Sequence, residues 1–167
     1  MARLIHGPIY IFDIDGVILI NLDSVYHHHT AREVLEDWYY GPLMEALGKV
    51  RPRRIGIELL ISRAKLGKVV LVTGRPERLR RITVVQLKEV GVYGHISALL
   101  MREDANRDPE WVIKPSLVSK YLEDPLLVKE VHDDNEMVLN SYAKLFPHAK
   151  LYLHLPKGYM EYQLSEI

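Results

Sequence analysis

Two carboxylates one residue apart, Asp13 and Asp15, are the strongest chemical signal in the sequence. They follow an apolar run at 9–12 and precede Gly16. Such a run is typical of a buried strand of a parallel sheet, in which residues two apart point to the same face. We therefore expect both side chains side by side at the carboxyl end of this strand, where open α/β sheets bind ligands.

Two like charges at such close range cost free energy unless a cation or a proton lies between them. The pair therefore indicates a functional site. The alternative is structural, with one aspartate capping a helix and the other in a turn.

Polar residues also stand where the later apolar segments end or break. They are Thr73 and Gly74 after the run 68–72, Lys114 before Pro115, and Asp133 and Asp134 after the run 126–132. Because the carboxyl ends of parallel strands meet at one edge, these groups should converge with the first pair. Carboxylates without nitrogen or sulfur ligands suit Mg²⁺, and a hydroxyl and an ammonium suit phosphate oxygens. The set predicts Mg²⁺-dependent phosphoryl transfer.

Lys114 is the lysine we expect in the site. The residue before a proline disfavours the α region, so we expect a helix to begin, or begin again, at Pro115 with Lys114 just ahead of it. A helix N-terminus attracts anions, and the lysine adds a full positive charge there. Lys120 is the competing lysine, but it falls inside the predicted helix.

These segments resemble the four motifs of the haloacid dehalogenase (HAD) superfamily of phosphohydrolases. The first motif is matched by 12–17, the second by 71–74, the third by Lys114 and the fourth by 132–134. The motifs stand in the order of that superfamily, and the resemblance spans about residues 8–155. It implies a Mg²⁺-dependent phosphomonoesterase that is small or has a minimal cap.

The resemblance also implies a role for each matched residue. Asp13 would attack phosphorus and form an aspartyl-phosphate, and Asp15 would protonate the leaving oxygen and then activate water. Dehalogenase-like chemistry would not need this second acid, so Asp15 favours a phosphatase or a phosphotransferase. The remaining roles are Mg²⁺ binding by Asp13, the Asp15 carbonyl and Asp134, with Asp133 behind them or exchanged with Asp134, and phosphoryl binding by Thr73, the Gly74 N–H and Lys114.

The pattern of apolar runs predicts an α/β fold, a Rossmann-like three-layer α/β/α arrangement with a mainly parallel five-stranded sheet. The expected strands are 8–14, 68–74, 96–101, 126–132 and 149–155. The segment 17–20 fits a short hairpin or a helical turn, and the tail 158–167 is left unassigned. One HAD-like domain covers 1–167, with a helical insertion or small cap at 23–67. Its expected helices run from Thr30 to about Gly41, over 43–50 and over 52–66.

Composition limits the other classes. The 167 residues are 48% hydrophobic and 26% charged, with zero net charge and no cysteine, which excludes disulfides and thiolate chemistry. No apolar run reaches the roughly 20 residues of a membrane span, and no signal-peptide pattern opens the chain. We expect a cytoplasmic protein without a membrane partner. Neither the oligomeric state nor the pathway follows from the sequence.

The substrate class is left open. A small cap would leave the site open to a bulky phosphate, and 73–76 resembles the second motif of polynucleotide-kinase-type phosphatase domains, where an arginine follows the glycine. Arg75 is thus a candidate substrate contact, and with Arg78, Arg80 and Arg81 it forms a basic patch or, alternatively, a solvated helix face paired with Glu77. Zero net charge argues against tight nucleic-acid binding, so a nucleotide or another small phosphomonoester is as good a candidate as a polynucleotide end.

Two further alternatives concern activity and the histidine run. The chain could be a non-catalytic phosphate-binding scaffold, or a phosphotransferase or phosphomutase on the same fold. His27, His28 and His29 could form a solvated loop, or one of them could contact substrate.

Overall fold

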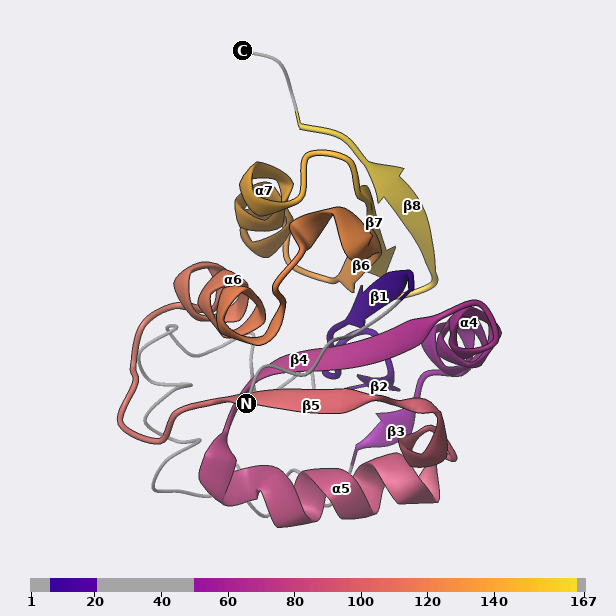
Figure 1. Cartoon of the computed structure of the whole chain (residues 1–167). Helices are drawn as coiled ribbons and strands as arrows, with labels where there is room; N and C mark the ends of the chain where they lie inside the picture. The colour runs from indigo at the N-terminus through magenta and orange to yellow at the C-terminus, as the bar shows by residue number, and fades with distance from the viewer. Residues whose placement is uncertain (1–6, 21–49, 165–167) are drawn as a thin grey trace.

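A six-stranded sheet forms the centre of the molecule, in the order β5-β4-β1-β6-β7-β8 (Figure 1). The computed structural model describes residues 7–20 and 50–164. The first five of these strands run parallel, and β8 is antiparallel to β7. Their bounds are β1 Ile9–Phe12, β4 Lys68–Pro76, β5 Ala98–Arg102, β6 Val128–Asp133, β7 Lys150–Leu155 and β8 Gly158–Tyr162.

Helices cover both faces of the sheet, which makes three layers (Figure 1). Helices α4 (Arg54–Ala64) and α5 (Arg80–Glu89) pack on one face, and α6 (Glu110–Tyr121) and α7 (Glu136–Leu145) pack on the other. The apolar side chains of strand β1 point to both faces, so each face needs a covering layer. Tyr10 and Phe12 belong to one core cluster, and Ile9 and Ile11 belong to the opposite one. This alternation buries all four side chains of a central strand.

The predicted fold class is confirmed, and the strand count differs by one. All five expected strands are present, with ends that shift by a few residues, and the sixth strand, β8, comes from the unassigned tail. Strand β8 lies at the edge of the sheet and is mostly exposed. It therefore lacks the regular alternation of apolar and polar residues by which a half-buried strand is recognised.

The segment after β1 forms a turn, as one of the two predicted alternatives holds, and not a short hairpin. The N–H groups of Ile18 and Leu19 donate to the Ile14 carbonyl, which closes a tight turn. The chain then enters β2 (Leu19–Ile20), which pairs antiparallel with β3 (Arg51–Pro52).

Part of the expected insertion belongs to the core. The helix predicted at 52–66 is α4, and its Leu60 is fully buried against the sheet. The three histidines and the two earlier predicted helices lie outside the described residues. Among the described residues, no helix has the length and apolar character needed to cross a membrane.

Candidate active site

Asp13 directly follows the last residue of β1 and is buried, with 4% of its surface exposed. Its backbone N–H donates to the His132 carbonyl of the neighbouring strand β6 at 2.9 Å, which places the ends of the two strands side by side. One residue later the Ile14 N–H donates to Asp13 Oδ1 at 2.8 Å. The nucleophile predicted from the sequence is therefore held by backbone groups in a fixed orientation.

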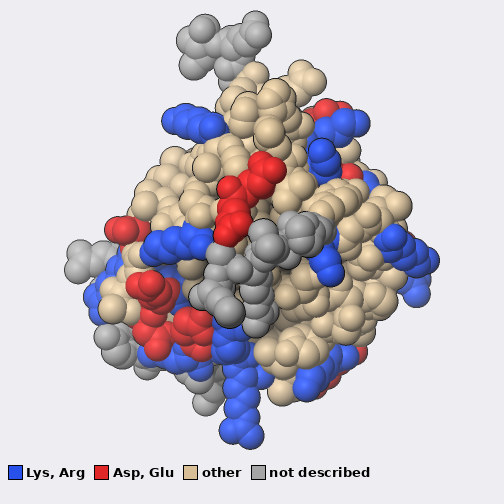
Figure 2. Space-filling view, viewed as in Figure 1, with Lys and Arg blue, Asp and Glu red and all other residues tan. Residues whose placement is uncertain are grey.

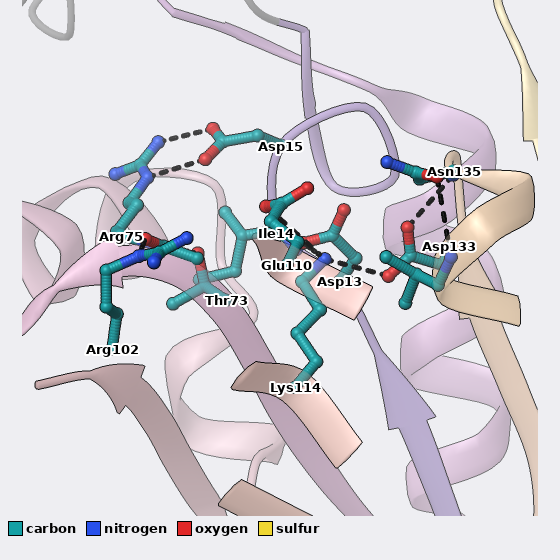
Figure 3. A network of polar contacts seen from close by, with 12 residues as sticks. Asp13, Ile14, Asp15, Thr73, Arg75, Arg102, Glu110, Lys114, Asp133 and Asn135 are labelled. Carbon is teal, nitrogen blue, oxygen red and sulfur yellow. Dashed lines mark hydrogen bonds and ion pairs between the residues drawn. The ribbon is translucent and has the colours of Figure 1, made fainter. Parts of the chain in front are cut away.

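Lys114 reaches this carboxylate from α6. Its Nζ lies 3.1 Å from Asp13 Oδ1 and 2.8 Å from Asp133 Oδ2, and the side chain is fully buried. Burial by itself lowers the pKa of the Lys114 ammonium, but the charges of Asp13 and Asp133 outweigh it, so the pKa is raised well above 10.5. The side chain is thus a permanent cation within reach of the expected nucleophile (Figure 3).

The predicted helix start at Pro115 is wrong. Helix α6 begins at Glu110, and Pro115 lies inside it in the second turn. A proline inside a helix forfeits one backbone hydrogen bond and crowds the carbonyl four residues before it, yet α6 continues through Pro115. Lys114 reaches the site through its long side chain and not through the helix N-terminus.

Three carboxylates from two strand ends meet in one place. Ligand oxygens of Asp13, Asp133 and Asp134 all lie within 4.8 Å of one another. Asp133 Oδ1 also accepts the N–H of Asn135 at 3.0 Å, which fixes that carboxylate at the start of α7. The parallel sheet thus brings together carboxylates that lie far apart in the sequence, as predicted.

The electrostatics of this cluster favour a cation. Burial, followed by the charge of Asp133, raises the pKa of Asp13 well above its usual value. The same two causes raise the pKa of Asp134 to about 8, although that residue as a whole is exposed. One ammonium faces three carboxylates, so negative charge is in excess. An all-oxygen set of this kind suits Mg²⁺.

Gly16 makes room for the third carboxylate. It has a φ of +89°, which favours glycine, and a Cβ at this position would collide with the carboxylate of Asp134. The glycine of the first predicted motif is therefore explained by the approach of a group more than a hundred residues away.

Asp15 does not lie beside Asp13, contrary to the expectation from strand alternation. Strand β1 ends at Phe12, and the chain turns before Asp15 is reached. The Asp15 carboxylate instead forms a two-pronged ion pair with Arg75, with distances of 2.8 Å to Nε and 2.6 Å to NH2 (Figure 3). The predicted general acid thus points away from the carboxylate cluster in this structure.

Arg75 is a buried residue and not part of a surface patch. Its NH1 donates to Gln86 Oε1 at 2.6 Å and to Thr83 Oγ1 at 3.2 Å, both on α5. Of the other arginines of the proposed patch, Arg80 pairs with Glu77 on an exposed helix end, as the alternative interpretation holds. Thr83 and Gln86 were not predicted, although their polar character on a buried helix face was a usable signal.

Thr73 and Gly74 lie in β4, where the strand passes the site. Thr73 is 1% exposed, and its Oγ1 accepts the Arg75 N–H at 3.1 Å. The Gly74 carbonyl accepts Nε of the buried Arg102 at 2.7 Å. These bonds hold the two residues predicted to bind phosphate, although their role stays a prediction.

Glu110 is a fourth acidic residue that the sequence analysis missed. Its Oε1 lies 3.7 Å from Lys114 Nζ, one helical turn away. It also covers Gly74, where a Cβ would collide with it. The i,i+4 spacing between Glu110 and Lys114 was the signal, which the predicted helix start at Pro115 obscured.

A row of hydrogen-bonded, largely buried side chains leads from Arg53 to Glu130. Arg53 NH1 lies 2.8 Å from His154 Nδ1, His154 Nε2 lies 2.9 Å from His132 Nδ1, and His132 Nε2 lies 2.9 Å from Glu130 Oε1. Arginine only donates and a carboxylate only accepts, so each ring carries its proton on Nε2. Burial lowers the pKa of both histidines, that of His154 to about 3, and Arg63 completes the chain at Glu130.

Arg53 connects this row of side chains to the loop that carries Asp15. Its NH1 donates to the Val17 carbonyl at 3.1 Å, and its NH2 donates to the carbonyls of Leu155 and Gly158 at 2.9 and 2.8 Å. Gly56 lies against the same Val17 carbonyl, with no room for a Cβ.

The chain has the fold of the HAD-superfamily hydrolases. A HAD-superfamily hydrolase of subfamily IA, variant 1, from Geobacter sulfurreducens matches with a TM-score of 0.57 and 14% identity over 87% of this chain and 85% of that chain. A haloacid dehalogenase-like family protein from Streptococcus pneumoniae matches with a TM-score of 0.57 and 11% identity over 87% and 83%.

Chains of the Pnkp1/Rnl/Hen1 RNA repair complex are similar as well. One has a TM-score of 0.64 and 18% identity, over 88% of this chain and 42% of that chain. This protein therefore spans less than half the length of that repair chain. No protein-family model and no curated protein matches the sequence.

Proposed function

We propose that the chain is a Mg²⁺-dependent phosphomonoesterase that forms an aspartyl-phosphate on Asp13. The observation that carries the proposal is the meeting of Asp13 with Lys114, Asp133 and Asp134 at the carboxyl ends of β1 and β6. Likeness to HAD-superfamily hydrolases supports phosphatase-type chemistry in general.

In the first step Asp13 is the nucleophile. A carboxylate oxygen of Asp13 forms a bond to phosphorus as the bond to the ester oxygen breaks. The Ile14 N–H and Lys114 both contact Oδ1, which fixes the plane of the carboxylate for the attack. Thr73, the Gly74 N–H and Lys114 would bind the non-bridging oxygens and offset their charge.

Asp15 would handle the proton in both steps. It gives a proton to the leaving oxygen, then takes one from the water that attacks phosphorus and releases phosphate from Asp13. To reach the reacting oxygen its side chain must turn from the ion pair with Arg75. Arg75 would then be a positioning residue that receives Asp15 again between turnovers.

The residues that would hold Mg²⁺ are Asp13, Asp134 and the Asp15 carbonyl, with Asp133 behind them. Four features fit such an ion: all-oxygen donors, distances within 4.8 Å among the three carboxylates, the raised pKa of two carboxyls and the missing side chain at Gly16 that lets Asp134 approach. When bound, the ion supplies positive charge against the phosphoryl group.

The proposal is tested by replacing the nucleophile. Hydrolysis of 4-nitrophenyl phosphate with Mg²⁺ should fall to background in Asp13→Asn, with the circular dichroism spectrum unchanged. Asp108→Asn makes the same chemical change at an exposed position and should keep wild-type turnover. Wild-type turnover by Asp13→Asn contradicts the proposal. So does a purified chain that hydrolyses no phosphate ester with Mg²⁺.

The substrate class we propose is a nucleotide, another small phosphomonoester or a polynucleotide end. On the face shown in Figure 2, acidic and basic side chains are interspersed, in keeping with a net charge of zero. The likeness to a chain of an RNA repair complex is the reason to include 3′- and 5′-phosphorylated oligonucleotides in a substrate panel. Cytoplasmic location stays a prediction from the sequence.

A further inference from the structure

Glu110 brings a negative charge to the place where the proposed function expects a phosphate. Its Oε1 covers Gly74, whose N–H is a predicted phosphoryl donor, and lies 3.7 Å from Lys114 Nζ. Glu110 and Asp13 both approach the Lys114 ammonium, at 3.7 and 3.1 Å, so Glu110 lies near the nucleophile (Figure 3). A carboxylate is an odd neighbour for a phosphate dianion, because the two repel each other.

Glu110 is not needed to hold Lys114 in place. The Lys114 ammonium already lies 2.8 Å from Asp133 and 3.1 Å from Asp13. The separation of 3.7 Å from Glu110 is longer than a hydrogen bond. As the first residue of α6, Glu110 also meets the positive end of the helix dipole, but that role does not require its carboxylate to cover Gly74.

The exposure of these side chains places Glu110 at the rim of the site. The Lys114 side chain is fully buried and that of Asp13 is 5% exposed, whereas that of Glu110 is 39% exposed. A phosphoryl group bound to Asp13 and Lys114 would point its alcohol portion outward, since only that portion can extend to solvent. Glu110 lies on the solvent side of the buried pair, next to this part of a substrate.

We propose that Glu110 is a specificity-determining residue that accepts a hydrogen bond from the alcohol portion of the substrate. The favoured class is a phosphomonoester with a hydroxyl or an ammonium group adjacent to the ester oxygen. An ionised carboxylate only accepts hydrogen bonds, so it binds a substrate that offers a donor and repels one that offers only oxygen acceptors. This inference rests on the proposed phosphomonoesterase function.

Three aryl phosphates separate the donor from other effects. Phenyl phosphate has no neighbouring group, 2-methoxyphenyl phosphate has an acceptor there, and 2-hydroxyphenyl phosphate has a donor. In the wild-type chain with Mg²⁺ we expect kcat/KM for the hydroxy ester to exceed that for the methoxy ester about 10-fold, the value of one charge-assisted hydrogen bond. Calorimetric binding of the same esters should show the same preference.

Substitution of Glu110 should remove the preference for the hydroxy ester, which is measured as a ratio of kcat/KM values within each variant. In Glu110→Ala the ratio should fall to about 1, and in Glu110→Gln, which keeps an acceptor without the charge, to about 3. Phenyl phosphate, which has no neighbouring donor, is measured in every variant as the reference, so that a general change in activity is separated from a change in the ratio. Glu58→Gln is the matched control, because Glu58 forms an exposed i,i+4 pair with Arg54 at 3.8 Å.

Equal loss of kcat for all three esters in Glu110→Ala would mean a merely structural role and overturns the inference. An unchanged ratio, or a change in the Mg²⁺ requirement alone, also overturns it. A chain that binds the esters with the expected preference but hydrolyses none supports the assignment of Glu110 and contradicts the proposed phosphatase function.

Discussion

The ion pair between Arg75 and Asp15 should be one of the most stabilising polar contacts of the described chain. Arg75 is fully buried, and the Asp15 side chain is 14% exposed. Arg75→Met removes the two bonds to Asp15 and those to Thr83 and Gln86. It leaves a nearly buried carboxylate without its counter-ion, and breaking such a pair costs about 3–5 kcal/mol.

The partial exposure of Asp15 places the expected loss at the lower end, about 3 kcal/mol. For a chain of this size each kcal/mol lowers Tm by about 2–4 °C, so we expect a drop of about 6–12 °C. Arg80→Met is the control, because Arg80 and Glu77 pair with side chains about two-fifths exposed. That variant should lose no more than about 1 kcal/mol.

A double-mutant cycle in urea isolates the pair from lost packing. If an uncompensated charge causes the loss, Asp15→Asn in the Arg75→Met background should recover about 1–2 kcal/mol. The reasoning is refuted if Arg75→Met unfolds at the same urea concentration as Arg80→Met, or if the cycle shows no coupling.

Two further predictions concern the loop after β1 and the buried histidines. Gly16→Ala places a Cβ against the Asp134 carboxylate at a φ of +89°. The variant should lose about 1–2 kcal/mol of folding stability and need more Mg²⁺ for half-maximal activity. Gly94→Ala, whose Cβ meets nothing within 4 Å, should show neither effect. An Mg²⁺ titration equal to wild type would contradict this. The pKa of His154 is lowered to about 3, so the unfolded chain takes up a proton that the folded chain refuses as the pH falls below about 6.5. His154 should therefore lower the wild-type stability in urea by up to about 1.4 kcal/mol per pH unit from pH 6.5 towards pH 4, measured as the difference in slope from His154→Gln, and equal slopes would show that the ring does not stay neutral.

The features that the sequence predicted well are those fixed by a strand end. Asp13 and Asp133 directly follow or end a buried run, so the parallel sheet brings them together whatever the loops do. Lys114 was chosen by its type and order, and its Nζ lies 3.1 Å from Asp13 Oδ1 even though the expected helix start was wrong.

The features that were missed depend on chain turns and on buried polar groups. The orientation of Asp15 follows from a turn centred on the Ile14 carbonyl, which strand alternation does not describe. Arg75 looks like a surface residue in a run of arginines, yet Thr83 and Gln86 give it polar partners in the interior. The polar character of these two positions was a usable signal, but only the three-dimensional contact shows that Arg75 is their partner.

The guanidinium of Arg53 ties two distant parts of the chain into one mechanical unit. It is bonded at once to the Val17 carbonyl and to Leu155 and Gly158, the residues on either side of the turn between β7 and β8. A displacement of the β7–β8 hairpin is therefore transmitted through the Arg53 guanidinium to the backbone of Val17, two residues beyond Asp15. The turn between β7 and β8 and the loop after β1 therefore cannot move apart without breaking these hydrogen bonds.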